Sequence, residues 1–226
     1  MSIAKIDEDF GGTNLMIKKR ISKRIISCFV LCALMISSIM GFAITSNAAS
    51  VNSRQRSDGT YVYYVGDESS LRKAINCVQD GDGIEFTNNI FCYGNLGVSK
   101  RITIDLRYYY LCFKWASYGL ETHRDVTVKN GVIYGSNDSD SAVCIWNGNL
   151  KLQNMSIFAG DCNSYTYYKG NGIYAYSSYS KIYMDYCYIQ GGRNYQNSGI
   201  RAGKAVYGGT IVSQGRGFVV VNGICR

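Results

Sequence analysis

The fold of this chain is decided by three similar stretches: DVTVKNGVIYG at residues 125–135, NLKLQNMSIFAG at 149–160 and SKIYMDYCYIQG at 180–191. Each contains an alternating apolar segment, a polar break, a second short apolar segment and a glycine. Strict alternation places every second side chain on one face of an extended strand. Each stretch therefore predicts two short β-strands joined at a break, with one face directed toward a core.

The copies recur at short intervals along the chain. A weaker copy begins at Ile102 and a degenerate one at Ala205, so the copies start at 102, 126, 150, 182 and 205, in steps of 24, 24, 32 and 23 residues. A period in this range is typical of a solenoid, in which successive units stack. A third strand is predicted to complete each rung at 142–146, 172–176, 199–203 and 217–221.

The composition also favours an all-β protein. The chain has no proline, 25 glycines and 20 tyrosines. Proline lacks the N–H that a strand bonded on both sides must donate, whereas glycine suits tight corners and tyrosine suits pleated surfaces.

The N-terminus predicts a signal peptide over residues 1–48. A basic segment at 18–24 precedes an apolar run at 25–44, and small residues follow at 46–48, so cleavage is expected after Ala48 or Ala49. The alternative is a membrane anchor, because the run approaches the ~20 apolar residues that a span needs. The protein is therefore expected to be secreted, either extracellular or at the cell surface.

After the signal peptide, residues 49–68 are expected to form a polar lead-in with a short strand at 61–65. Ser69 and Ser70 are predicted to cap a short helix, because apolar residues follow at positions 71, 74, 75 and 78 and Gly81 lies just past the end. Terminal units of solenoids are normally capped, so this helix is expected to cover the first rung of a domain at 69–226.

The charge of the exported part favours anionic partners. From Ala49 onward there are 18 Lys and Arg against 13 Asp and Glu, a net charge of +5. Outside a cell such partners are acidic polysaccharides, wall polymers or lipid surfaces, and no nucleic acid is expected; the alternative is merely a soluble basic protein. The seven cysteines that follow Ala49 include no CxxC pair and are expected to be mostly small buried hydrophobic residues.

Four segments together resemble a known family: SLRKAI at 70, DGDGIEF at 80, RITIDL at 101 and VTVKNGVI at 126. They are similar to the secreted right-handed parallel β-helix proteins of the pectate-lyase-like group. The resemblance runs from Ser69 to the C-terminus and implies a right-handed parallel β-helix of about five to six rungs with a short N-terminal capping helix. The catalytic segments of that group are not matched: IYMDYC at 182–187 is only faintly like their WIDH strand, and neither RxPxxR nor GHG occurs.

The loops between the second and third strands, at 135–141, 160–171, 191–198 and 214–217, are the predicted functional edge. Stacked rungs would place them side by side, about 4.8 Å apart. The aspartates predicted to hold Ca²⁺ are Asp138, Asp140 and Asp161. The predicted base or uronate clamp is Lys169 or Arg193. The residues expected to bind substrate are Tyr165, Tyr167, Tyr168, Tyr195 and Arg216. The alternative is a solvated edge of polar turns.

Other polar positions have structural interpretations. Asn130 and Asn154 occupy the same slot of successive rungs, which predicts a short asparagine ladder. A column of outward side chains is expected to stabilise the sheet: Asp105, Lys129, Gln153 and Asp185. His123, the only histidine, lies between two rungs and is expected to be an exposed loop residue rather than a general base.

Two functional hypotheses follow. The first is an enzyme acting on acidic polysaccharide by Ca²⁺-assisted β-elimination, with a base that removes the C5 proton. The second is a non-catalytic surface adhesin or structural carbohydrate-binding module. Because no second cap follows the strand expected at 217–221, end-to-end self-association, or a chain that is a truncated version of a longer solenoid, is also predicted.

Overall fold

The computed structural model describes residues 51–162, 169–194, 200–201, 204–213 and 220–222. The chain divides after Ala49 into two units, and every described residue lies in the second. This part is mostly β-structure with parallel sheets and one helix. That helix is too short and polar to cross a membrane.

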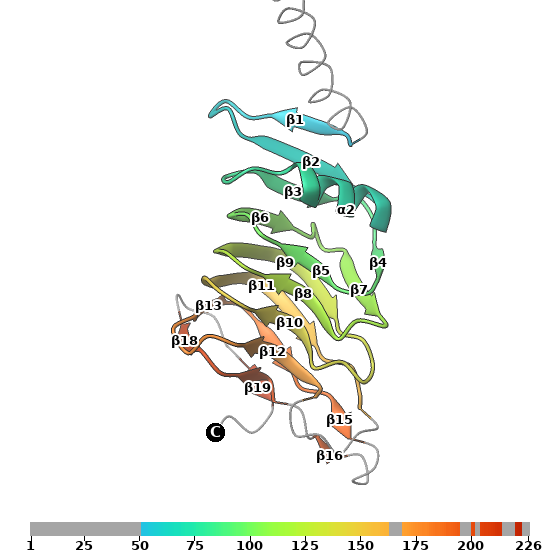
Figure 1. Cartoon of the computed structure of the whole chain (residues 1–226), viewed down its shortest axis with the longest axis vertical. Helices are drawn as coiled ribbons and strands as arrows, with labels where there is room; N and C mark the ends of the chain where they lie inside the picture. Colours follow the sequence, from blue (N-terminus) through green and yellow to red (C-terminus); the bar gives the residue numbers. More distant parts are fainter. Residues whose placement is uncertain (1–50, 163–168, 195–199, 202–203, 214–219, 223–226) are drawn as a thin grey trace, which may run out of the picture. The chain divides into compact units, whose positions relative to one another are not determined.

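Within the described residues, the larger sheet has twelve strands (Figure 1). Eight follow one another across it: β1 (Ser53–Gln55), β2 (Tyr61–Val65), β3 (Gly83–Phe86), β6 (Ile102–Asp105), β9 (Val126–Tyr134), β11 (Leu150–Phe158), β13 (Lys181–Asp185) and β18 (Thr210–Ser213). Four more pair beside this path: β4 (Ile90–Tyr93), β7 (Tyr110–Lys114), β14 (Tyr188–Gln190) and β19 (Val220–Asn222).

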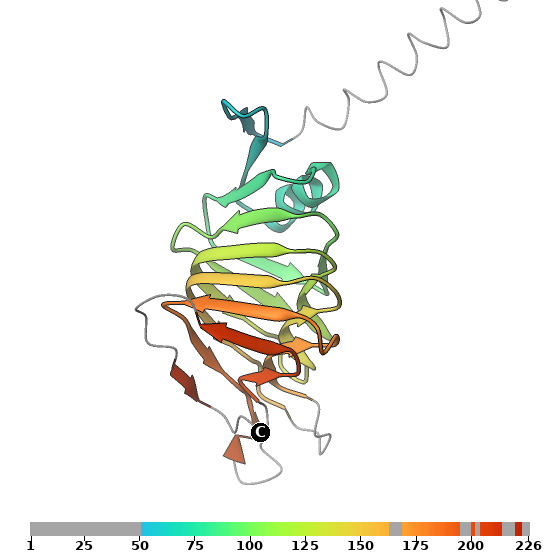
Figure 2. The same ribbon diagram turned by 90° about the vertical axis from the view of Figure 1, so that its left-hand side faces the viewer.

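A second sheet collects the third strand of each repeat. Its strands are β5 (Leu96–Val98), β8 (Tyr118–Thr122), β10 (Ser141–Ile145), β12 (Asn171–Ala175) and β17 (Val206–Tyr207). Among the described strands, all pairings are parallel except β1 with β2 and β15 (Arg193–Asn194) with β16 (Ile200–Arg201). Strands of successive repeats thus lie beside one another, as both views show (Figures 1 and 2).

The predicted alternation sets the register and the core. Ile104, Val128, Leu152 and Met184 face one another across four neighbouring strands, and each is at most 1% exposed. The 24-residue step keeps this column in register, because Val126 pairs with both Ile102 and Leu150. A one-residue slip would turn every one of these side chains outward, so burial of one face fixes the pairing.

The predicted asparagine ladder is confirmed at the bend inside β9 and β11. Asn130 and Asn154 have φ of 56° and 52°, left-handed conformations that asparagine tolerates well. The Asn154 side-chain amide donates to Asn130 Oδ1 at 3.1 Å, and the Asn130 amide donates to Asp105 Oδ1 at 3.1 Å. The outward column is also confirmed, since Lys129 lies opposite Asp105 and Gln153, and Gln153 lies opposite Asp185.

Helix α2 (Glu68–Cys77) is confirmed, but its predicted cap is wrong. Asp67 is the N-cap: its side chain accepts from Ser70 N at 2.7 Å, while the Ser70 hydroxyl accepts from Asp67 N at 3.2 Å. In such a capping box the aspartate precedes the serine by three residues. The helix therefore begins earlier in the chain than predicted, at Glu68. Leu71 and Ala74 are buried on the inner face.

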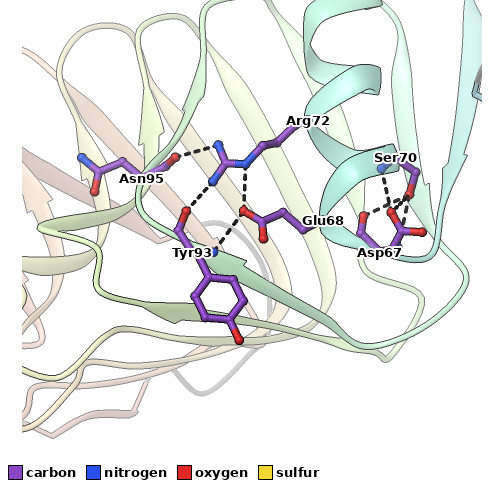
Figure 3. Close-up of polar contacts among 6 residues, drawn as sticks. All are labelled: Asp67, Glu68, Ser70, Arg72, Tyr93 and Asn95. Carbon is purple, nitrogen blue, oxygen red and sulfur yellow. Dashed lines mark hydrogen bonds and ion pairs between the residues drawn. The ribbon is translucent and has the colours of Figure 1, made fainter.

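The helix is tied to the adjacent corner between β4 and β5 (Figure 3). The Arg72 guanidinium donates to the main-chain carbonyls of Tyr93, at 2.8 Å, and Asn95, at 3.1 Å. Glu68 accepts from Arg72 Nε at 2.8 Å and from Tyr93 N at 3.1 Å. These bonds satisfy main-chain groups of the corner and fix the backbone from which the Tyr93 ring projects.

Two local predictions are corrected at the ends of the described region. The polar lead-in contains a strand, β1, which pairs with β2. The last repeat does not start at Ala205: Val206–Tyr207 pairs with the third strand β12, Thr210–Ser213 pairs with the first strand β13, and Val220–Asn222 pairs with the second strand β14. Strands of two to four residues carry too little periodicity to set their own register.

The described cysteines behave as predicted. Cys92, Cys144, Cys162 and Cys187 are buried, and Cys77 and Cys112 are partly buried. Burial raises the pKa of both Cys92 and Cys144 to about 12, so these thiols stay protonated at neutral pH. Cys225 lies outside the described residues.

Candidate functional site

The described parts of the loops at 135–141, 160–171 and 191–198 lie side by side, as predicted. Asp138 N donates to Asp161 O at 2.9 Å and Cys162 N donates to Arg193 O at 2.8 Å. Gly170 N donates to Ser139 O at 2.8 Å, which links the far end of the long loop to the preceding repeat. The described parts of these loops therefore form one continuous edge.

The predicted base or clamp residues lie on this edge. Lys169 Nζ donates to the main-chain oxygen of Asp138 at 3.1 Å. Arg193 has an exposed side chain, while its main-chain N donates to Asp161 Oδ1 at 2.8 Å. The structure thus brings Lys169 to Asp138 and Arg193 to Asp161, each through one main-chain group.

Asp140, the third aspartate predicted to hold Ca²⁺, interacts with Ser117 and Tyr118. Asp140 is half-buried, and its main-chain N donates to Ser117 O at 2.7 Å. Burial, followed by the charge of Asp140 and a hydrogen bond with it, raises the pKa of Tyr118 to about 12. In the part of the chain that the structure describes, no group of three or more His, Cys, Asp or Glu residues is arranged to hold a metal ion. The Ca²⁺ site over Asp138, Asp140 and Asp161 therefore stays a prediction.

The residues predicted to bind substrate are four tyrosines and one arginine. Tyr165, Tyr167, Tyr168, Tyr195 and Arg216 all lie outside the described residues. The sugar-binding role assigned to them stays a prediction.

A groove of about 430 Å³ adjoins the loop edge. It is lined by residues 112–115 and 135–138; we call this the loop groove. Trp115 is 84% exposed, with its ring centroid 5.2 Å from that of Tyr93. Lys114 Nζ lies 5.4 Å from the centroid of Phe91 and 5.9 Å from that of Tyr93. The loop groove therefore combines an open indole, a cation held over aromatic rings and the exposed Asp138.

A row of rings continues from the loop groove across the larger sheet. Consecutive ring centroids are 5.3–6.1 Å apart in the order Phe91, Tyr110, Tyr134, Phe158 and Tyr188. They lie on adjacent parallel strands, where cross-strand aromatic pairs stabilise a sheet. Tyr134 immediately precedes Gly135, so this row and the loop groove share a border.

Trp115 was not predicted, because the predicted functional edge begins only at Gly135. The signal was available: tryptophan occurs only twice in the chain, and Trp115 follows Lys114 at the end of the second strand of its repeat. Trp115 therefore lies between the second and third strands of its repeat, as do the loops of the predicted functional edge.

Comparison with family models, curated proteins and solved structures finds no match to this chain. The function must therefore be argued from the geometry of the edge and the loop groove.

Proposed function

We propose that residues 69–226 wind as a right-handed parallel β-helix of about five to six rungs. The order of the strands supports this: β9, β10, β11 and β12 follow one another, while β11 pairs in parallel with β9 and β12 with β10. Crossovers between parallel strands of one sheet are almost always right-handed. An experimental structure with left-handed crossovers would contradict the proposal.

The protein is, in this proposal, exported and binds an acidic polysaccharide or wall polymer in the loop groove. The observation that carries the proposal is Trp115, a large aromatic side chain exposed at the wall of a groove beside Lys114 and facing the loop of Asp138. An indole that is 84% exposed has no role in the core, and exposed aromatic groups with a few polar neighbours are typical of ligand sites.

Each part of the loop groove suits one part of an acidic sugar. The indole face offers an apolar platform for the C–H groups of a sugar ring. The Lys114 ammonium complements a uronate carboxylate, and the Asp138 carboxylate is a hydrogen-bond acceptor for hydroxyl groups. Lys169 reinforces the loop that carries Asp138 and adds a second positive charge to the same edge.

A matched pair of variants tests the proposal. Trp115→Asn and Tyr108→Asn each remove an aromatic side chain more than four-fifths exposed, and both positions have a positive φ, of 55° and 66°, that asparagine tolerates. In calorimetric titration of the purified protein with a uronate oligomer, Trp115→Asn should weaken binding by about 1–2 kcal/mol, roughly five- to thirtyfold in Kd. Tyr108→Asn should leave Kd unchanged. Equal affinities of the two variants would refute binding in the loop groove.

The same titration separates binding from catalysis. β-Elimination would release an unsaturated product that absorbs ultraviolet light, and Lys169 or Arg193 would act as base or clamp. Binding without such a product would support the non-catalytic module. Product that disappears in Lys169→Ala would instead assign an elimination reaction to this edge.

A further inference from the structure

A small cavity of about 150 Å³ lies at the other end of the third strands. It is lined by Arg101, His123, Arg124, Asp125, Asn147 and Gly148. These residues come from three successive turns, which follow β5, β8 and β10 and lead back into the larger sheet. We call this the turn cavity.

The turn cavity has an excess of positive charge. Lys100, Arg101 and Arg124 are close enough to lower the pKa of Asp80, although the hydrogen bond from Arg101 N is the main cause. Arg101 also pairs with Asp80 at 3.4 Å, but both side chains are more than half exposed, so the pair is weak. No ion pair of Arg124 is found among the described residues.

The carboxylate in the wall of the turn cavity is already engaged. Asp125 Oδ1 accepts from Asn149 N at 2.8 Å and from the Asn149 amide at 3.1 Å. It therefore orders the next turn. Arg101 and Arg124 accordingly remain the groups best able to receive an anion.

Aromatic rings border the turn cavity on the side of the smaller sheet. The His123 ring stacks on that of Trp146, with centroids 6.4 Å apart and planes 11° apart. Trp146 Nε1 donates to Glu121 Oε2 at 2.7 Å, which fixes the indole. The ring of Tyr176, 67% exposed, lies 5.2 Å from that of Trp146. Cations and a fixed aromatic platform thus occupy neighbouring positions.

We propose that the turn cavity and the Trp146 platform form a second glycan site, which binds a sugar ring bearing an oxyanion, either a uronate carboxylate or a sulfate ester. Arg101 and Arg124 hold the oxyanion, because guanidinium groups bind planar or tetrahedral oxyanions through paired N–H donors. Trp146 and Tyr176 hold the ring. The choice of a sugar rests on the proposed function, but the site itself is independent of the loop groove.

The two sites are separated by the length of a third strand. The loop groove residues 135–138 precede β10, whereas Asn147 and Gly148 follow it. Five residues at about 3.3 Å each give roughly 16 Å. One sugar unit therefore cannot fill both sites, and each can be measured alone.

The chain offers a separate fluorescent reporter for each site, because Trp115 and Trp146 are its only tryptophans. In a Trp115→Asn background, emission comes from Trp146 alone, and the loop groove has lost its indole. The titrants are a uronate oligomer, a sulfated galactan oligomer and the uncharged galactan oligomer. At least one charged titrant should change the Trp146 emission at concentrations where the neutral oligomer does not, and the responding titrant identifies the oxyanion.

Arg124→Gln in that background should raise the Kd for the responding titrant at least tenfold. Lys73→Gln, which removes the same charge from an exposed position on α2, should change that Kd less than twofold. An absence of any Trp146 response to both charged oligomers, or equal shifts in Arg124→Gln and Lys73→Gln, would overturn the second site. Neither outcome bears on the loop groove, which Trp115 reports in a Trp146→Phe variant.

Discussion

The guanidinium of Arg72, on the helix, donates to the main-chain carbonyl of Tyr93 at 2.8 Å. The Tyr93 ring in turn packs against Trp115 in the wall of the loop groove. Arg72 of α2 therefore positions the backbone of Tyr93, whose ring lies against the proposed sugar platform; Figure 3 shows the bond between Arg72 and Tyr93.

Arg72→Ala should accordingly affect both stability and binding. It removes charge-assisted bonds to two carbonyls, so the free energy of unfolding should fall by about 1–2 kcal/mol in chemical denaturation. The Kd for a uronate oligomer should rise severalfold, because the Tyr93 corner loosens. Lys73→Ala, on the exposed side of the same helix, is the control for helix content. An equally large loss of stability and affinity in Lys73→Ala would contradict a specific role of Arg72.

The helix cap gives a pH-dependent prediction. Hydrogen bonds from Ser70 hold the pKa of Asp67 below the usual aspartate value. The stability that Asp67 contributes is therefore present above its unfolded pKa, about pH 4, and is lost as pH falls through the lower folded value. Asp67→Ala should cost about 1 kcal/mol at pH 7 and much less at pH 2.

Ser69→Ala is the matched control for the cap, since the Ser69 side chain is exposed and takes no part in the capping box. Thermal unfolding at the two pH values would measure both variants. A larger loss in Ser69→Ala than in Asp67→Ala would show that the helix begins later than the structure places it.

Cys112 should report occupancy of the loop groove. It lines the groove and is partly buried, and burial raises the pKa of its thiol. Alkylation should therefore accelerate as pH rises toward that pKa. A bound uronate oligomer should slow alkylation of Cys112 severalfold and leave partly buried Cys77 unaffected, as peptide mapping by mass spectrometry would measure. Equal protection of both cysteines would indicate general stabilisation instead of binding in the groove.

The strands, their repeat and the asparagine ladder could be predicted because each is encoded by a local pattern that recurs. Val126, Leu150 and Ile182 alternate with polar residues over enough positions to set the buried face. The pattern failed where it was short: Val206–Tyr207 has two residues and no period of its own. Its place beside β12 is set by the preceding repeat.

The candidate sites were only partly predictable, for a different reason. Stacking of the loops brings Lys169 to Asp138, which the repeat spacing implied. The packing of His123 on Trp146 depends on side-chain directions at a turn, and no spacing rule encodes those directions. His123 is an exposed residue between two strands, as predicted, but its contact with Trp146 was not predicted, so the turn cavity beside it was missed.

The asparagine ladder ends at a residue that does not suit its position. Asp185 pairs with Gln153, so Tyr186 occupies the slot of Asn154 in the next repeat. Tyr186 has a φ of 51° and is 57% exposed. A left-handed conformation costs a tyrosine about 1–2 kcal/mol, and its side chain cannot donate an amide N–H to Asn154 Oδ1.

Tyr186→Asn should therefore stabilise the protein by about 0.5–1.5 kcal/mol, raising Tm by roughly 2–5 °C in calorimetry. Tyr186→Gly relieves the backbone strain without supplying an amide, so the excess of Asn over Gly measures the added ladder bond. That excess should vanish in an Asn154→Ala background, because the new amide then lacks its acceptor. A stabilisation by Tyr186→Asn that persists unchanged in that background would show that backbone strain alone, and not the ladder, limits stability at this bend.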